Sequence, residues 1–479
     1  MLSFFLESRI RARVAKLVDA LDLGSSSLTG VWVQVPPLVP KKERLIMSKE
    51  SNITFDSTFS ELNKQYTFTI EIPKEVISDF FDFAATNQQK RVSSPGFKEN
   101  AIPLEYIKEH YKKNIINHTK EITLKYFVFD FLLEKIQEHK FMIVGEPELK
   151  SISMDLDQNA VYTFIAQAPR ELFIQSWKNL PFKATQRKKY RDIDNQVTYF
   201  LSTEEESYKE HKHVTSVQLG DWVSFNAWII NDKNKPIFKQ NKTSLWLKIG
   251  HEEPDKVFLS LFLNKSIGDT FVTDNPSLQH YFCELFDTSY VYMIEIIDIL
   301  PYSYFSIEHL KQHFKLKTKK DLHNKLIEIF SFNSDISQRR TIAHSALDII
   351  ITKNNIMIDP ESVKKHQFFL IQDLQQTPDY NVYKMDTKFL DRAYELAEKQ
   401  LVEKIIADHI AYQENLLVQP TDIKSMLSLL QRTRTKEFLY FPFLQTKHQG
   451  QEVPVSLKQL HRSCLREKAV NHIIHHLTK

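Results

Sequence analysis

The hydrophobic period changes in a fixed order through the first patterned stretch of the chain, and this order constrains the fold. In "QYTFTIEIP", Tyr66, Phe68, Ile70 and Ile72 alternate with polar residues, which is typical of a half-buried strand. "KEVISDFFDFAATNQQ" then has helical spacing, and the turn-rich "RVSSPGFKENAIP" follows it. A helical run over 104–139 precedes the strand-like "SISMDL" and "AVYTFIAQA". This order predicts a compact α+β domain with an exposed tip between its helices.

The first 46 residues lack such a pattern, and targeting is the first explanation to test. A secretory signal places its positive charge before an apolar run, whereas here Arg9, Arg11 and Arg13 follow the apolar "MLSFFL". Transit peptides are poor in acids, yet Asp19 and Asp22 lie in the amphipathic part of this segment. Both kinds of targeting peptide are therefore disfavoured.

The same segment resembles the translation of a tRNA gene. Val33–Pro36 can be encoded in the form of a TψC arm, and Lys16–Ala20 in the form of a D arm. Between them, Asp22–Gly24 can supply an anticodon loop, so three arms fall in the right order. We therefore expect residues 1–46 to be a non-native leader and translation to start at Met47.

The charge of the chain depends on this leader. The whole chain has 63 Lys and Arg and 60 Asp and Glu, of which the leader holds seven and four. Residues 47–479 therefore hold 56 of each and are neutral. Because a large nucleic-acid footprint needs a basic excess, we expect no DNA partner. Only the local basic stretch "KATQRKKYRD" (183–192) remains.

Length, cysteines and glycines bound the class of protein. The 433 residues from Met47 onward are enough for two to four domains. Two cysteines, Cys283 and Cys464, suit a reducing compartment, and no apolar run approaches the roughly 18 residues of a membrane span. We therefore expect a cytoplasmic protein with no membrane partner. Only six Gly follow the leader, and GxxxxGK, GxGxxG, GxSxG and HExxH are absent from the sequence, so we expect no cofactor.

The predicted tip carries a family motif. "SSPGFKENAIPLEYIKEHY" resembles the ribosome-binding loop of bacterial trigger factor, written G-F-R-x-G-K-x-P in typical members. Gly96, Phe97 and Pro103 match it, Lys98 replaces Arg, and Glu99 stands where a basic residue is usual. The resemblance implies that Gly96, Phe97 and Lys98 bind the large ribosomal subunit near the tunnel exit. In the alternative interpretation, Phe97 folds back onto the flanking helices.

The rest of the chain follows the plan of the same family. "QLGDWVSFNAWI" and "LNKSIGDTF" resemble an FKBP-type prolyl isomerase, and "QLVEKIIADHIAYQENLLVQPTDIKSMLSLL" resembles the arm region of trigger factor. The fold class expected is therefore α+β multidomain, with an antiparallel FKBP-like domain and an elongated all-helical C-terminal chaperone domain with arms. The expected divisions are the leader at 1–46, the ribosome-binding domain at 47–165, a linker at 166–205, the isomerase-like domain at 206–301 and the helical domain at 302–479.

The prolyl pocket is altered relative to the family. An isomerase pocket is a dry aromatic cavity, which favours the twisted amide. Here Ala227 takes the position of a strand aromatic, while Phe238 and Phe258 are retained and Trp246 and Tyr292 are candidate walls. As an alternative, the last two are ordinary aromatics of a β core. We expect an open, wet pocket in an FKBP-like shape, with weak or absent catalysis.

The histidines near the C-terminus raise the question of a metal site. His472 and His476 are spaced i, i+4, and His475 lies between them. No carboxylate or Cys accompanies them, and chain ends fray, so we expect a solvated tail and no bound metal. Cys464 lacks a nearby base and is predicted to serve packing.

The resemblance implies an ATP-independent chaperone that binds nascent and unfolded polypeptides at the ribosome. Its apolar surface is expected between the arms and the N-terminal domain, and the 34 Phe of the chain suit such a surface as well as a core. Two other functions stay open. One is an active prolyl isomerase, and the other is a protein-interaction scaffold off the ribosome, for which Glu99 is the evidence. A homodimer off the ribosome is also compatible with the resemblance.

Overall fold

The computed structural model describes most of the chain after the leader. The described residues are 53–93, 96–97, 102–174, 177–183, 192–210, 216–238, 242–282, 289–302, 307–333, 336–375, 380–442, 446–448 and 450–478. The leader (1–46), Lys98, Glu99 and most of the basic stretch 183–192 lie outside them.

The N-terminal part is an antiparallel sheet with helices on one face, as the hydrophobic periods predict. The strands are ordered β1-β2-β4-β3. Alternate residues of β2, including Phe68, Ile70 and Ile72, are buried against the helices. The elements are β1 (Thr54–Ser60), β2 (Gln65–Ile72), α2 (Lys74–Gln89), α3 (Leu104–His110), α4 (Lys112–Thr123), the π-helical turn η1 (Leu124–Val128), α5 (Phe129–Glu138), β3 (Val144–Ser153) and β4 (Ala160–Gln167).

A second antiparallel sheet, ordered β15-β7-β6-β9-β8, has four of its strands within 206–301, where an antiparallel domain was expected. Its edge strand β15 was not predicted, because it is two residues long and arrives from the C-terminal part to pair with β7. The elements are β6 (Trp222–Ile230), β7 (Thr243–Lys248), the 3-10 turn η3 (Glu253–Asp255), α7 (Lys256–Phe262), β8 (Thr270–Thr273), α8 (Pro276–Phe282), β9 (Val291–Leu300) and β15 (Val455–Ser456).

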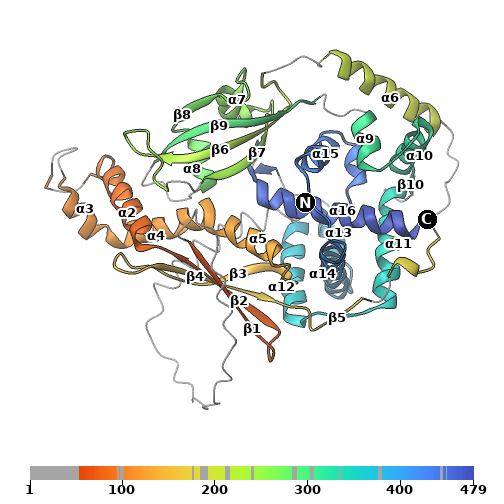
Figure 1. Cartoon of the computed structure of the whole chain (residues 1–479), viewed down its shortest axis with the longest axis horizontal. Coiled ribbons are helices and arrows are strands. Elements are labelled where there is room, and N and C mark those ends of the chain that lie inside the picture. The colour runs from red at the N-terminus through yellow and green to blue at the C-terminus, as the bar shows by residue number, and fades with distance from the viewer. Residues whose placement is uncertain are drawn as a thin grey trace.

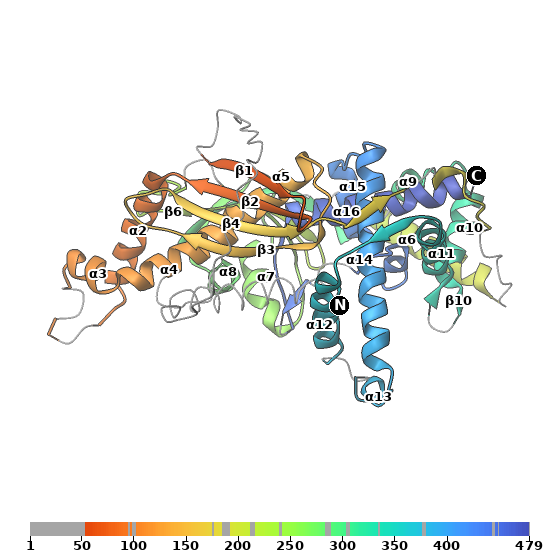
Figure 2. The ribbon, with the colours of Figure 1, turned by 90° about the horizontal axis from the view of Figure 1, so that it is seen from below.

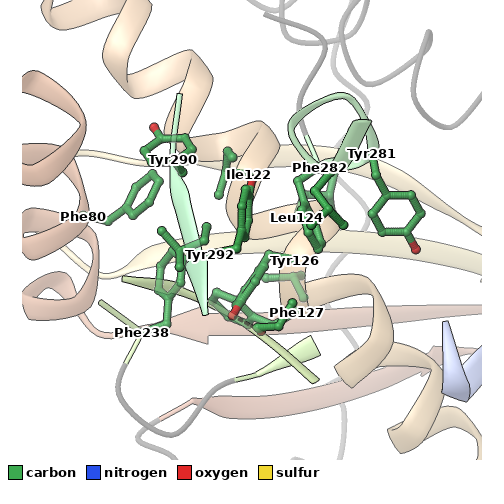
Figure 3. Packing of buried hydrophobic residues seen from close by; sticks show 14 of the residues in the cluster. Phe80, Ile122, Leu124, Tyr126, Phe127, Phe238, Tyr281, Phe282, Tyr290 and Tyr292 are labelled. Carbon is green, nitrogen blue, oxygen red and sulfur yellow. Dashed lines mark hydrogen bonds between the residues drawn. The ribbon is translucent and has the colours of Figure 1, made fainter. Parts of the chain in front are cut away.

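Both sheets pack on the same helical layer, with α4 and α5 between them (Figure 1). Phe238, which follows β6, contacts Phe80, Tyr126 and Phe127 of the N-terminal helices at ring-centroid distances of 4.8, 5.2 and 5.4 Å (Figure 3). The Tyr126 hydroxyl donates a hydrogen bond of 2.7 Å to the carbonyl oxygen of Ala227 on β6. The two units therefore share one hydrophobic core.

The remainder is a body built mainly of helices. Its α10 begins with a capping box, in which Asp321 N donates to Thr318 Oγ1 over 3.1 Å and Thr318 N donates back to the Asp321 carboxylate. The main helices are α6 (Ile193–Glu210), α9 (Ile307–His313), α10 (Lys319–Phe330), α11 (Gln338–Lys353), α12 (Pro360–Leu374), α13 (Tyr380–Lys384), α14 (Phe389–Gln413), α15 (Pro420–Leu430) and α16 (Leu457–Leu477).

The prediction of an all-helical C-terminal part is wrong in detail, because short strand pairs join its segments. One of them, β5 with β12, ties the predicted linker to the end of α11. The pairs are β5 (Glu171–Phe173) with β12 (Asn355–Met357), β10 (Phe332–Asn333) with β11 (Ile336–Ser337) and β13 (Lys447–His448) with β14 (Gln451–Glu452), and the 3-10 turns are η2 (Trp177–Asn179) and η5 (Thr435–Phe438).

The last helix, α16, is a central element, so the prediction of a solvated tail is wrong. Ala469 and Ile473 are fully buried in it. Arg466 Nε and Nη2 form a two-pronged ion pair with Asp408 of α14, at 2.8 and 2.7 Å. Charge-assisted pairs of this geometry are strong and directional, so this pair fixes α16 against α14.

The arm of the helical body is formed by α12, α13 and the first half of α14, which project from the body (Figure 2). The stretch compared with the family's arm region begins at Gln400 and instead enters the core, where Leu401, Ile405 and Ile410 are buried. Within the described part of the chain, no helix is both long and apolar enough to cross a membrane.

The shared core yields a stability prediction. Phe238→Ala should lower the free energy of unfolding by about 3–5 kcal/mol, since it removes a buried ring and leaves a cavity. Tyr126→Phe should cost less, about 0.5–1.5 kcal/mol, because the ring stays in place and the hydroxyl with its hydrogen bond to Ala227 is lost. Phe173→Ala is the control, since Phe173 is exposed. Urea unfolding followed by tryptophan fluorescence measures all three, and unchanged stability of Phe238→Ala would show that the two units do not share a core.

Candidate functional site

The tip between α2 and α3 presents Gly96 and Phe97, at the end of the molecule remote from α16 (Figure 2). Gly96 has φ +92°, a left-handed conformation that favours glycine, while a Cβ there would meet no atom within 4 Å. Glycine is therefore favoured at this position by the backbone conformation and not by a lack of space for a side chain. Phe97 is 38% exposed, and its ring leans on Tyr106 of α3 with centroids 5.0 Å apart. The contact with α3 agrees with the alternative interpretation, in which Phe97 packs on a flanking helix, while ribosome binding by the exposed part of the ring stays a prediction.

Three of the four aromatics assigned to the prolyl pocket lie in the shared core. Phe238, Phe258 and Tyr292 are all buried, and Tyr292 stacks on Phe282 with centroids 5.5 Å apart (Figure 3). Ala227 is fully buried on β6, where the N-terminal helices cover it. The expectation of an open, wet pocket is therefore wrong at these residues, because the side chains of the N-terminal helices fill the space.

The fourth aromatic, Trp246, does not join the other three. Its strand neighbours Leu245 and Leu247 are buried in the shared core, so Trp246 points to the opposite face of the sheet, as the pleat requires. There it packs in a different core, which also contains Trp222 of β6 and Leu460 of α16. A single pocket lined by Trp246 and Tyr292 is excluded by this geometry.

The arm carries six exposed apolar side chains, which we call the arm patch. Val382, on the short helix α13 at the far end of the arm, is 70% exposed. Met385, which directly follows this helix, is 84% exposed. The arm patch consists of Phe368 on α12, Val382 and Tyr383 on α13, Met385 after it, and Leu390 and Leu396 on α14.

Polar contacts hold the arm in place without covering the patch. At its base, Lys365 of α12 pairs with Glu148 of β3 at 3.0 Å. Along the seam between α12 and α14, His366 Nε2 lies 3.0 Å from the Gln400 side-chain oxygen, and burial lowers the pKa of His366 to about 3. The histidine is therefore neutral at physiological pH, and the seam is a packed interface that leaves the outer apolar side chains free.

The histidines of α16 do not form a metal site. The rings of His472 and His476 lie 4.5 Å apart, and both contact Trp177 of the segment after β5. His472 Nε2 also lies 3.5 Å from Glu414 Oε2. Among the described residues, no group of three or more His, Cys, Asp or Glu is placed to hold a metal ion. Burial raises the pKa of the Cys464 thiol, which is consistent with packing rather than reactivity.

Sequence reasoning missed the arm patch. Its signal was present in "YNVYKMDTKFLDRAYELAEK", where Val382, Met385 and Leu390 repeat between charged residues. Such a repeat is also typical of a buried helix face. Only the three-dimensional arrangement shows that these side chains are mostly exposed.

Comparison with known proteins places this architecture in a family. Residues 55–199 match the family model described as bacterial trigger factor protein (TF). Trigger factor of Aquifex aeolicus (strain VF5) is 26% identical over 168 residues, which are 35% of this chain and 33% of that protein. The alignment thus spans a third of the Aquifex protein's length.

Two further similarities extend over most of the chain. Trigger factor of Rickettsia rickettsii (strain Sheila Smith) is 18% identical over 430 residues, covering 86% of this chain and 91% of that protein. One solved structure is described as "Promiscuous Substrate Recognition in Folding and Assembly Activities of the Trigger Factor Chaperone". Its chain is 16% identical to this one, with a TM-score of 0.32, and the match covers 86% of this chain and 97% of that chain. The N-terminal match and the long alignment to the Rickettsia protein support a divergent trigger factor.

Proposed function

We propose that the protein is an ATP-independent cytoplasmic chaperone that holds nascent and unfolded polypeptides on its arm patch, and that its tip binds the large ribosomal subunit near the tunnel exit. The observation that carries the proposal is the arm patch itself. Soluble proteins rarely expose contiguous apolar surface unless it binds something. Family membership is consistent with this proposal.

The composition of the arm patch suits varied clients. Met385 is flexible and polarisable, so it adapts to apolar segments of different shape. Leu390 and Phe368 add branched and aromatic surface on the two neighbouring helices. Each side chain that a client covers contributes roughly 1.5–3 kcal/mol when it is fully buried. A few such contacts give reversible holding without a defined sequence requirement.

The tip provides a second contact in this proposal. The free face of Phe97 allows an aromatic wedge to enter a cleft on the ribosome, and Gly96 supplies the sharp turn that presents it. Lys98 follows in the sequence and would meet ribosomal phosphate. Glu99 would oppose the same contact, so we propose weaker ribosome binding than in a typical family member.

Prolyl isomerisation is proposed only as a weak activity. Phe238 is 3% exposed and packed among three aromatic rings, so a peptide cannot reach it in this arrangement. An active isomerase would require the N-terminal helices to separate from the five-stranded sheet. An interaction scaffold off the ribosome would keep the arm patch but not the contact at the tip. The experiments below separate these functions.

The proposed holding activity is tested by removing the apolar character of the arm patch. Substituting Val382, Met385 and Leu390 together by Ser should abolish most suppression of aggregation when an unfolded client is diluted from guanidinium, measured by light scattering. The melting temperature should be unchanged, because all three side chains are exposed. The matched control substitutes Leu62, Ile336 and Leu417, which are exposed elsewhere, by Ser. Equal loss of activity in both triple variants would refute a specific role of the arm patch.

Ribosome binding is tested at Phe97 with a closely matched control. Phe97→Ala should reduce co-sedimentation with ribosomes at all salt concentrations, since an apolar contact is not screened, whereas Lys98→Ala should matter mainly at low salt. Phe59→Ala is the control, because Phe59 is 37% exposed and also leans on a tyrosine, Tyr66, at 4.8 Å. If Phe97→Ala co-sediments like the control, the tip is not a ribosome anchor and the scaffold function is favoured.

Isomerase activity is tested on a short X-Pro peptide. We expect cis-to-trans conversion close to the uncatalysed time of tens to hundreds of seconds at 25 °C, because the retained aromatics are buried. A coupled protease assay with the intact protein measures the rate. Turnover comparable to an ordinary FKBP-type enzyme would contradict the occlusion of Phe238 and show that the helices and the sheet separate readily in solution.

A further inference from the structure

The helical body encloses a cavity that the proposed chaperone function does not use. Its volume is about 470 Å³, and it lies between the end of α9, the start of α11, α15 and α16. None of the arm-patch residues lines it. Cavities of this size hold small molecules when a few polar groups converge on them.

One buried guanidinium converges on this cavity. Arg339, the second residue of α11, is 3% exposed and lines the cavity wall. Its Nη2 donates to the Asn471 side-chain oxygen, its guanidinium lies 5.8 Å from the centre of the Phe314 ring, and its Nε has no hydrogen-bond partner in the described structure. No Asp or Glu among the described residues forms an ion pair with it. The next residue, Arg340, by contrast pairs with Glu437 at 3.2 Å.

Burial lowers the pKa of Arg339, and the nearby carboxylates of Glu328 and Glu467 oppose this shift without forming an ion pair with it. Glu328 is paired with Lys325 at 2.8 Å instead. The cavity lining has four Lys or Arg, namely Lys315, Lys325, Arg339 and Lys468, and two acids, Asp422 and Glu467. Asp422 is already paired with Lys468 at 2.6 Å. The Glu467 carboxylate accepts the backbone N–H groups of Tyr440 and Phe441 at 3.0 and 2.7 Å, and burial raises its pKa to about 7.

A buried, unpaired cation is costly, and an anion that enters the cavity would offset this cost. We propose that the cavity is a binding site for a small ligand with an oxyanion group, either phosphate or carboxylate, which pairs with the Arg339 guanidinium. The planar guanidinium suits both groups, since each presents oxygens at the spacing of its N–H donors. Bound there, the ligand links the segment after α9 to α11 and α16, and so stabilises the helical body.

The site is tested by calorimetric titration of the full chain with inorganic phosphate and, separately, with succinate. Sodium chloride at matched ionic strength is the reference. We expect saturable binding of one of the two anions and a melting temperature that rises with its concentration above the Kd. The anion that binds identifies the ligand class. If neither anion shows saturable binding beyond the chloride reference, the proposal is overturned.

Variants locate the binding. Arg339→Met should weaken the anion affinity by about 10- to 100-fold, which corresponds to losing a charged hydrogen-bonded pair. It should keep or raise the stability of the ligand-free protein, because an unpaired buried charge is removed. Arg340→Met, which loses an ion pair outside this cavity, should leave the affinity unchanged. Arg339→Lys retains the charge without the fork and should bind with intermediate affinity. Wild-type affinity in both Arg339 variants would place the anion elsewhere and overturn the proposal.

Discussion

The insertion of Phe238 among Phe80, Tyr126 and Phe127 is the contact on which the arrangement of the N-terminal half depends. Each ring buries a large apolar area and offset or tilted aromatic pairs add to it, so the contact joins a helical layer to a sheet far along the chain. The helices α4 and α5 lie between the two sheets (Figure 1), so each sheet covers one side of this helical layer. Through Phe80, α2, the helix that precedes the tip, thereby packs against Phe238, which follows β6. The same contact buries Phe238, one of the aromatics that the family resemblance assigns to a prolyl pocket, so in this packing a peptide could not reach it.

The C-terminal segment joins this half to the helical body. Its β15 adds a strand to the five-stranded sheet beside Trp246, and Ser456 donates a 2.7 Å hydrogen bond to Asp130 of α5. A few residues later, Arg462 pairs with Glu146 of β3 at 2.5 Å. One short stretch of chain thus contacts both sheets and then enters the centre of the helical body. The arm extends from a base that is fixed on several sides, which allows its outer surface to remain apolar without collapsing onto the core.

The parts of the fold that follow from local sequence were predictable. The alternation through Phe68 and Ile70 determined β2, and the spacing of Thr318 and Asp321 determined the start of α10, because both signals act within a few residues. The strand β15 was not predictable, since its two residues gain a partner only from a strand some 200 positions earlier. The face to which Trp246 points was not predictable either, because Leu245, Trp246 and Leu247 are consecutive apolar residues and either side of β7 could meet the N-terminal helices. Nor could spacing show that α16 is central, because the apolar residues of a central helix and of an end helix follow the same period. At the candidate site, the motif located Gly96 and Phe97, while the arm patch depends on the exposure of its side chains, which no local pattern contains.

The arm and the anion cavity place opposite demands on the helical body. In the proposed function, holding clients requires exposed apolar side chains. These side chains stay exposed only if the helices that carry them are held rigidly and do not collapse onto the core. In the seam of α14 against α12, the small residues Ala393 and Ala397 are buried, which allows close approach of the helices. The cavity at α11 and α16 is the reverse case, since there the Arg339 guanidinium is buried and none of the described residues forms an ion pair with it. Stabilisation by a bound anion would reach the arm through α11 and α14, which pack in one hydrophobic core. Ligand binding would therefore act on client holding through the rigidity of the base, with no contact to the client itself.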